Sequence, residues 1–217
     1  MNKKGCVHYM LSTVKSKLKE KRITIINYQL RKRLVNQDFT IISNNCWGGQ
    51  VYQDLGIEYK TPFAGLFIFA PDYIKLLSNF EFFMNSPLEF SKTSKYVKNA
   101  NYPVGLLNGE VEIHFLHYED EVEALSKWNR RTERINWGNL FFKFCDRDLC
   151  TKDLLIEFDR LPLKNKVCFT AQKHSDLKHS VWFSEHNNQE FVEPELKTYK
   201  KYFDVVTWLN TGKIVKK

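Results

Sequence analysis

A cysteine occupies the junction between an apolar run and a helical pattern, where it could do nucleophilic chemistry. The run Thr40-Ile41-Ile42-Ser43 is followed by two asparagines and then Cys46, and a helix-like pattern begins at the next residue. Backbone amides and the macrodipole at a helix N-terminus favour a thiolate. Cys46 is therefore a candidate nucleophile or anion-binding residue. Burial behind the turn, which is common for free cysteine, is the alternative.

A histidine follows a later strand pattern and could act as the base for that thiol. His117 comes directly after the alternating run 111–116. If the two loops adjoin, His117 takes the thiol proton and later protonates a leaving group. His114 lies three residues earlier, so in an extended strand it points to the opposite face and shares its own face with Glu112. One of the two histidines is expected to be structural, and the predicted catalytic pair is Cys46 with His117.

The residues around Cys46 have the types that bind polar ligands. Two adjacent glycines permit close approach of the backbone to a ligand, although the fuller G-x-G-x-x-G and Walker patterns are absent. The second asparagine offers a polarising amide, and the tryptophan offers a flat surface on which a sugar or a base can stack. The predicted substrate-binding residues in this segment are Asn44, Asn45, Trp47, Gly48 and Gly49.

An Asp-x-Asp triplet follows another apolar run. Asp146 and Asp148 flank Arg147 directly after the run 139–145. Carboxylates at this spacing can hold a divalent metal against a diphosphate, because Mg²⁺ and Mn²⁺ prefer oxygen ligands. Asp146 and Asp148 are therefore the candidate metal ligands. Capping of the helix after Cys150, or plain exposure, is the alternative.

A cluster of cations lies on a predicted helix over 127–134. Arg130 with Arg134, and Lys127 with Arg131, are neighbours at i,i+4 spacing. Planar guanidinium groups suit phosphate or carboxylate recognition, so Arg130 and Arg131 are predicted to clamp an anionic substrate. A solvated helix face that pairs with acids of the same helix is the alternative.

The elements that must position these residues alternate along the chain from residue 38. Apolar or alternating runs predict strands over 39–43, 64–70, 111–116, 139–145 and 166–171, and helical patterns over 47–55, from 71, from 119 and over 151–160 separate them. The sequence therefore predicts an α/β fold: a single domain with a largely parallel, Rossmann-like sheet flanked by helices. Ligands bind outside the carboxyl ends of such strands, so the candidate residues are expected to share one rim.

Composition narrows the class of protein. With 217 residues, 43% of them hydrophobic, the chain is long enough for one good core. No run approaches the roughly 18 apolar residues of a membrane span, and residues 1–21 lack the apolar region of a signal peptide. The five cysteines are odd in number and show no close C-x-x-C pair. These features predict a cytoplasmic protein.

The net charge of +8 is unevenly distributed. Residues 1–37 carry ten basic side chains and one acid, giving +9, whereas the remaining 180 carry 23 basic and 24 acidic residues, giving −1. A neutral body argues against nucleic acid as a partner. We predict a basic N-terminal helical segment over 1–37 followed by an α/β domain over 38–217. That segment could lie on the anionic inner face of the cell membrane, or dock on the core as a solvated helix.

Several uncommon strings recur together in one group of proteins. Ser-Asn-Asn-Cys-Trp-Gly-Gly over 43–49, Tyr-Pro-Val-Gly over 102–105, His-Phe-Leu-His-Tyr over 114–118 and Trp-Asn-Arg-Arg over 128–131 resemble a bacterial family of unknown-function proteins labelled exopolysaccharide biosynthesis. The resemblance covers residues 38–210. It implies an α/β fold and a setting in capsule or exopolysaccharide gene clusters, and no catalytic residue is carried over from it. A looser similarity joins the strand-Asn-Cys-helix junction to a capsule-biosynthesis group of acyl-transfer-like proteins.

Three functions are compatible with these residues. The leading hypothesis is a transferase that moves a group, preferably an acyl group from an acyl-CoA donor, to a glycan or lipid-linked glycan precursor at the membrane. Cys46 would be the nucleophile or line the donor site, and His117 would be the base. The second hypothesis is a glycosyltransferase that uses a nucleotide sugar with Mg²⁺ or Mn²⁺ at Asp146 and Asp148. The third is a non-catalytic assembly module docked at the membrane through residues 1–37.

Overall fold

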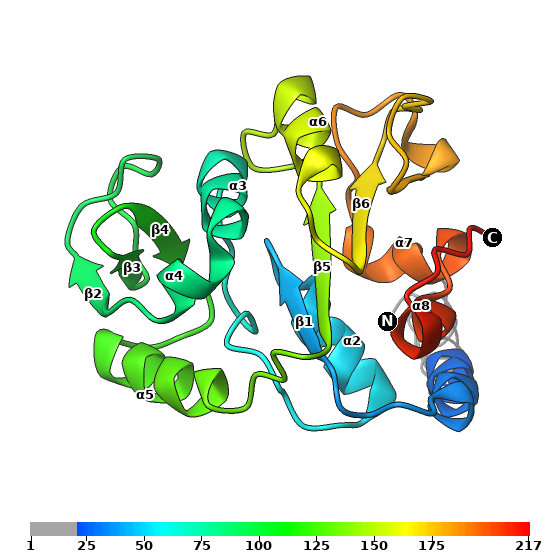
Figure 1. The fold of residues 1–217 in the computed structure, drawn as a ribbon, viewed down its shortest axis with the longest axis horizontal. Helices are drawn as coiled ribbons and strands as arrows, with labels where there is room; N and C mark the ends of the chain where they lie inside the picture. Colours follow the sequence, from blue (N-terminus) through cyan, green and yellow to red (C-terminus); the bar gives the residue numbers. More distant parts are fainter. Residues whose placement is uncertain (1–20) are drawn as a thin grey trace, which may run out of the picture.

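A four-stranded parallel sheet lies at the centre of the computed structural model, which describes residues 21–217 (Figure 1). Its strands are β1 (Thr40–Ser43), β5 (Leu140–Cys145), β6 (Lys166–Thr170) and β7 (Ser180–Trp182), paired in the order β1-β5-β6-β7. β1, β5 and β6 are almost completely buried, and β5 and β6 are mostly apolar, as expected for strands covered on both faces. The predicted α/β class, with a single domain and a parallel sheet flanked by helices, is confirmed.

Alternate residues of the strands enter two separate cores. On one face, Phe141 and Phe169 pack with α2 (Trp47–Leu55), α7 (Glu195–Tyr202) and α8 (Val205–Thr211). On the other face, Phe142 and Phe144 pack with α3 (Ala70–Ser78) and α6 (Lys152–Arg160). This division follows from the two-residue period of a strand. Gly56 follows α2 as its C-cap and adopts the left-handed conformation, with φ +68°.

Residues 21–33 are helical and attach to the first of these cores. Leu30 and Leu34 are buried against it, and the Arg33 guanidinium donates a hydrogen bond to the carboxylate of Asp204. The part of the predicted basic segment that covers residues 1–20 lies outside the described residues. Among residues 21–217, no helix is long and apolar enough to cross a bilayer.

A second sheet corrects the predicted role of the strand over 111–116. β2 (Leu88–Ser91), β3 (Val104–Leu107) and β4 (Val111–His114) form an antiparallel sheet, flanked by α4 (Phe80–Met84) and α5 (Glu121–Thr132). Asn108 and Gly109 reverse the chain between β3 and β4 with φ of +52° and +67°. An Asn-Gly turn of this kind favours a hairpin. β4 therefore pairs with its sequence neighbour rather than joining the parallel sheet.

The run over 64–70, predicted as a strand, is mostly irregular. Gly65 has a φ of +82°, which interrupts an extended chain, and α3 already begins at Ala70. Phe67 forms an isolated antiparallel bridge with His114, and the Ile68 amide donates to the Asn44 carbonyl at 2.8 Å. This buried segment thus joins the end of β1 to the second sheet, and the site lies at that junction.

Candidate functional site

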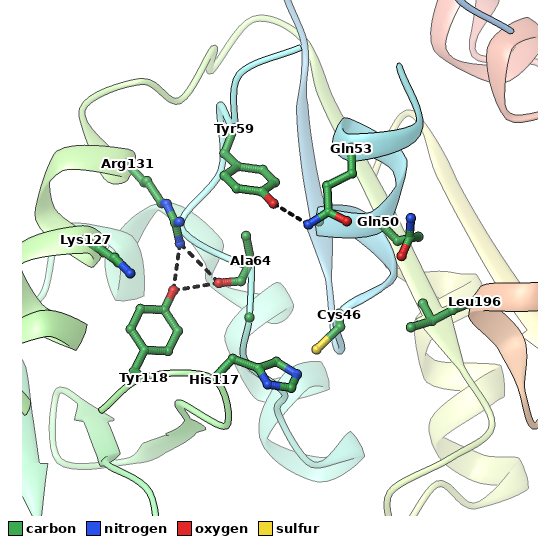
Figure 2. A pocket seen from close by; sticks show the side chains of 12 residues that line it. Cys46, Gln50, Gln53, Tyr59, Ala64, His117, Tyr118, Lys127, Arg131 and Leu196 are labelled. Atoms are coloured by element: carbon green, nitrogen blue, oxygen red, sulfur yellow. Dashed lines mark hydrogen bonds between the residues drawn. The ribbon is translucent and has the colours of Figure 1, made fainter. Parts of the chain in front are cut away.

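A cavity of about 320 Å³, the first chamber, opens beside the N-terminus of α2 (Figure 2). It lies between α2, the segment around Gly65, the loop after β4, one face of α5 and the start of α7. Its size is within the range typical of small-molecule sites. The lining residues are Cys46, Gly49, Gln50, Gln53, Tyr59, Ala64, Gly65, His117, Tyr118, Lys127, Arg131 and Leu196.

A second chamber of about 440 Å³ adjoins the first. The two cavities share Cys46, His117 and Leu196, so the thiol and the imidazole lie at their common boundary. The other residues that line the second chamber are Asn45, Phe67, Leu116, Arg147, Asp148, Glu193, Pro194, Glu195 and Lys197. Cys46 is thus accessible from both chambers.

Residues 12–210 match the protein family described as a domain of unknown function (DUF1919). The chain belongs to this family. It is also 38% identical, over 204 residues, to a Haemophilus influenzae protein described as an uncharacterized protein, and the match covers 91% of this chain and 96% of the relative. Neither description names a reaction, so the geometry of the site has to indicate the chemistry of this DUF1919 domain.

Cys46 is the N-cap residue of α2, as predicted, and its thiol faces both chambers. The thiol donates a hydrogen bond to the Leu66 carbonyl, with a sulfur–oxygen distance of 3.7 Å. Burial raises the pKa of the thiol above its ordinary value, although the nearby Lys143 ammonium acts in the opposite direction. Burial therefore outweighs the lowering of the thiol pKa that a helix N-terminus favours. A neutral thiol needs a base before it can attack.

His117 is the histidine that reaches the cavity. Its ring projects into the first chamber on the side of the Cys46 thiol (Figure 2). The His117 backbone amide donates to the Gly65 carbonyl at 3.1 Å. His114 instead lies in the core, stacked on Phe67 with ring centroids 4.7 Å apart. Its Nε2 is 3.3 Å from the Glu112 carboxylate, on the shared face that the sequence predicted. His117 is thus the candidate base, and His114 is structural.

Only one of the two predicted arginine clamps lines the site. The Arg131 Nη1 donates to the Tyr118 hydroxyl at 2.7 Å and to the Ala64 carbonyl at 3.1 Å, and the guanidinium lies over the Tyr59 ring (Figure 2). Lys127, one turn earlier on α5, lines the same chamber and pairs with the Glu123 carboxylate, as the alternative for this helix face predicted. Arg130 is exposed and lines neither chamber. The first chamber therefore presents a cationic wall suited to phosphate or carboxylate groups.

The predicted substrate-binding residues beside Cys46 have different environments. Trp47 is fully buried against Tyr199 and Phe169, so its ring lies in the core rather than at the predicted stacking surface. Gly48 faces β1, where an added Cβ would lie 3.1 Å from the Ile41 side chain, whereas Gly49 lines the first chamber. The apolar contacts of Trp47 therefore hold its ring in the core, away from the predicted ligand-binding rim of the sheet.

The two asparagines take part in a buried polar network. Asn44 Nδ2 donates to the Cys145 sulfur at 3.4 Å. Asn45 accepts from the Lys143 ammonium at 3.2 Å and donates to the Glu195 carboxylate at 3.0 Å. Asn45 lines the second chamber, whereas Asn44 is fully buried and does not line it. Both amides thus help to fix the turn that presents Cys46.

A buried ion pair beneath Cys46 was missed at the level of sequence. The Lys143 ammonium contacts the Glu195 carboxylate, and both side chains are almost completely buried. Burial alone would lower the pKa of Lys143, but the neighbouring Cys145 and Glu195 outweigh it and raise that pKa. The pair ties α7 to β5. A lysine in the otherwise apolar run 139–145 was the available signal, since an unpaired charge there would be very costly.

The two aspartates predicted as metal ligands have separate surroundings. The Asp146 carboxylate accepts backbone N–H groups from Ala171 and Val192, which ties together the segments after β6 and before α7. Asp148 lines the second chamber, and α6 is capped by Thr151 rather than by either aspartate. Within residues 21–217, no cluster of three or more His, Cys, Asp or Glu side chains is arranged to hold a metal ion.

Proposed function

We propose that this protein transfers an acyl group to a precursor of a surface polysaccharide, with Cys46 as the nucleophile. The observation that carries the proposal is the position of Cys46 and His117 at the boundary shared by two chambers. A thiol with an adjacent base can accept an acyl group from a donor on one side and release it to an acceptor on the other.

The first half of the reaction uses His117 as a general base. The imidazole takes the thiol proton, the Cys46 sulfur attacks the donor carbonyl, and a new carbon–sulfur bond forms. With an acyl-CoA donor, the original thioester bond breaks, and His117 returns the proton to the leaving sulfur. Burial raises the pKa of the Cys46 thiol, so this thiol is neutral at rest and its attack requires removal of the proton by His117.

The first chamber suits the donor. Its wall carries the guanidinium of Arg131 and the ammonium of Lys127, and both groups favour phosphate-bearing molecules such as a coenzyme A thioester. Gln50 and Gln53, from the exposed side of α2, add amides that can bind a polar donor.

The acceptor class and the location rest on the sequence. The resemblance to exopolysaccharide-biosynthesis proteins supports a glycan or lipid-linked glycan as the acceptor. The +9 charge of residues 1–37 supports a peripheral position on the cytoplasmic, anionic face of the membrane, where lipid-linked precursors are accessible.

An acylation assay tests the proposal. The full chain is incubated with acetyl-CoA or p-nitrophenyl acetate, and acetylated residues are located by peptide mass spectrometry. We expect a thioester on Cys46 that is lost in Cys46→Ala, and acylation slowed by about 10²–10⁴-fold in His117→Asn, the usual contribution of a general base. Cys46 makes no side-chain cap bond, so the alanine variant should keep α2.

A matched cysteine variant provides the control. Cys150 is also partly exposed but lines neither chamber, so Cys150→Ala should be acylated normally at Cys46. Full turnover by Cys46→Ala would exclude the nucleophile role. Stabilisation by a nucleotide sugar only in the presence of Mn²⁺ would favour the glycosyltransferase hypothesis, and absence of any ligand response would favour the docking module.

A further inference from the structure

The second chamber contains one carboxylate whose structural role is not evident. Glu195 is paired with Lys143, and Glu193 lies 3.7 Å from the Arg147 guanidinium. Among residues 21–217, the Asp148 carboxylate receives no hydrogen bond and forms no ion pair within 4.0 Å. This differs from Asp146, whose two oxygens each accept a backbone amide. Asp148 is thus the carboxylate in this chamber that is available to a ligand.

The backbone holds Asp148 in an unusual conformation. Asp148 and Leu149 have φ of +58° and +66°, in the left-handed region that residues other than glycine rarely adopt. The Asp148 carbonyl accepts the Ala70 amide at 2.9 Å, and the Cys150 amide donates to the Arg147 carbonyl at 3.2 Å. These bonds fix the turn despite its cost, which is typical of segments that position functional groups.

We propose that the second chamber binds the hydroxyl-bearing acceptor and that Asp148 removes the proton of the attacking hydroxyl. This inference rests on the proposed acyl transfer through Cys46. The chamber offers the apolar side chains of Phe67, Leu116 and Pro194 beside polar groups, a combination suited to the mixed faces of a sugar.

The second half of the reaction transfers the acyl group from Cys46 to the acceptor hydroxyl. The acceptor oxygen attacks the thioester carbon, the carbon–oxygen bond forms, and the carbon–sulfur bond to Cys46 breaks with its electron pair passing to sulfur. The hydroxyl proton goes to Asp148 and returns to the Cys46 thiolate once the ester leaves. Burial raises the pKa of the Asp148 carboxyl, which makes its carboxylate a stronger base.

The inference is tested by following discharge of the acyl-enzyme. Wild type and Asp148→Asn are first acetylated on Cys46 with p-nitrophenyl acetate, and excess reagent is removed. Loss of the acetyl group to water, the simplest hydroxyl acceptor, is then followed by intact mass. We expect acetylation at a similar rate in both proteins and discharge about 10²–10⁴-fold slower in the variant, the usual contribution of a general base.

Rescue by a strong nucleophile separates a catalytic role from a structural one. Hydroxylamine attacks a thioester without a base, so it should discharge both proteins at similar rates. Glu193→Gln removes another carboxylate of the same chamber, one paired with Arg147, and should slow discharge far less than Asp148→Asn does. Asparagine tolerates the left-handed conformation, so the variant should fold, and Asp148→Gly provides a second variant with the same backbone freedom.

The outcomes distinguish the two proposals. Absence of acetyl-Cys46 in wild type would overturn the proposed function and this inference with it. Formation of acetyl-Cys46 in both proteins, followed by equal rates of hydrolysis, would overturn the role of Asp148 and leave Cys46 as the nucleophile. Equal slowing in Glu193→Gln would also overturn it, because the effect would then reflect the charge of the chamber.

Discussion

Adjacent residues of the same type can have different functions when a helix directs them differently. Arg130 and Arg131 are consecutive in α5, so their side chains leave the helix about 100° apart. Arg131 points to the junction of the two sheets, where the Ala64 carbonyl and the Tyr118 hydroxyl accept its N–H groups. Arg130 points to solvent. The spacing of the cluster predicted a clamp but not which arginine would form it.

Arg131→Ala should weaken the use of anionic donors selectively. A hydrogen bond to a charged group contributes about 1.5–3 kcal/mol, so acylation of Cys46 by acetyl-CoA is expected to slow by about 10–100-fold. The neutral donor p-nitrophenyl acetate should react within a few-fold of wild type. Arg130→Ala is the matched control and should leave both rates unchanged. An equal loss with both donors would show that Arg131 supports the shape of the chamber rather than the anion.

The elements that could be predicted are those whose own sequences contain the apolar pattern that burial requires. The apolar runs that became β1, β5 and β6 were identified, and α2 and α6 were placed within a residue of their observed bounds. The run over 111–116 also became a strand, but periodicity does not reveal a partner. The Asn108-Gly109 turn that pairs β4 with β3 was a usable signal of the hairpin.

The candidate site was predictable in part for the same reason. Cys46 was identified because it lies between an apolar run and a helical pattern, and His117 because it follows an alternating strand pattern. Their meeting in one cavity depends on the bridge between Phe67 and His114, which joins the two sheets and is not local in sequence. Glu195 comes from a polar stretch without clear periodicity. Its pairing with Lys143 therefore required the three-dimensional structure.

Removing one partner of the Lys143–Glu195 pair should lower the stability of the fold much more than replacing both partners with apolar residues. Lys143→Met or Glu195→Leu alone leaves an unpaired charge in the core, and the free energy of unfolding should fall by about 3–5 kcal/mol. The double variant should lose less than the sum, because no uncompensated charge remains. Urea unfolding of the four proteins measures this coupling. Additive losses would mean that the two charges are stabilised separately, for example by Asn45 and by water.

At the scale of the molecule, the candidate site lies in a nearly neutral body, and the described part of the basic N-terminal segment lies away from it. Residues 21–33 pack near the C-terminal end of α2, where Arg31 donates to the Asp54 carbonyl at 3.0 Å. Cys46 lies at the opposite end of the same helix. Ile23, Ile25 and Tyr28 are exposed beside the cations Lys21, Arg22 and Lys32. Exposed apolar and basic side chains together are typical of segments that lie at a membrane surface.

The full chain should therefore bind anionic vesicles. Co-sedimentation with phosphatidylglycerol-containing vesicles should exceed that with phosphatidylcholine alone, and it should fall as salt is raised, because the attraction is electrostatic. Each basic residue near the surface contributes about 1 kcal/mol, so replacing Lys21, Arg22 and Lys32 with glutamine should weaken binding by about a hundredfold.

Replacing the exposed Lys92, Lys98 and Lys164 of the body in the same way is the matched control. Equal losses in the two triple variants would show that net charge alone governs binding. Equal sedimentation with both kinds of vesicle would contradict the proposed position on an anionic membrane. It would not bear on acyl transfer, which the experiments on Cys46 test separately.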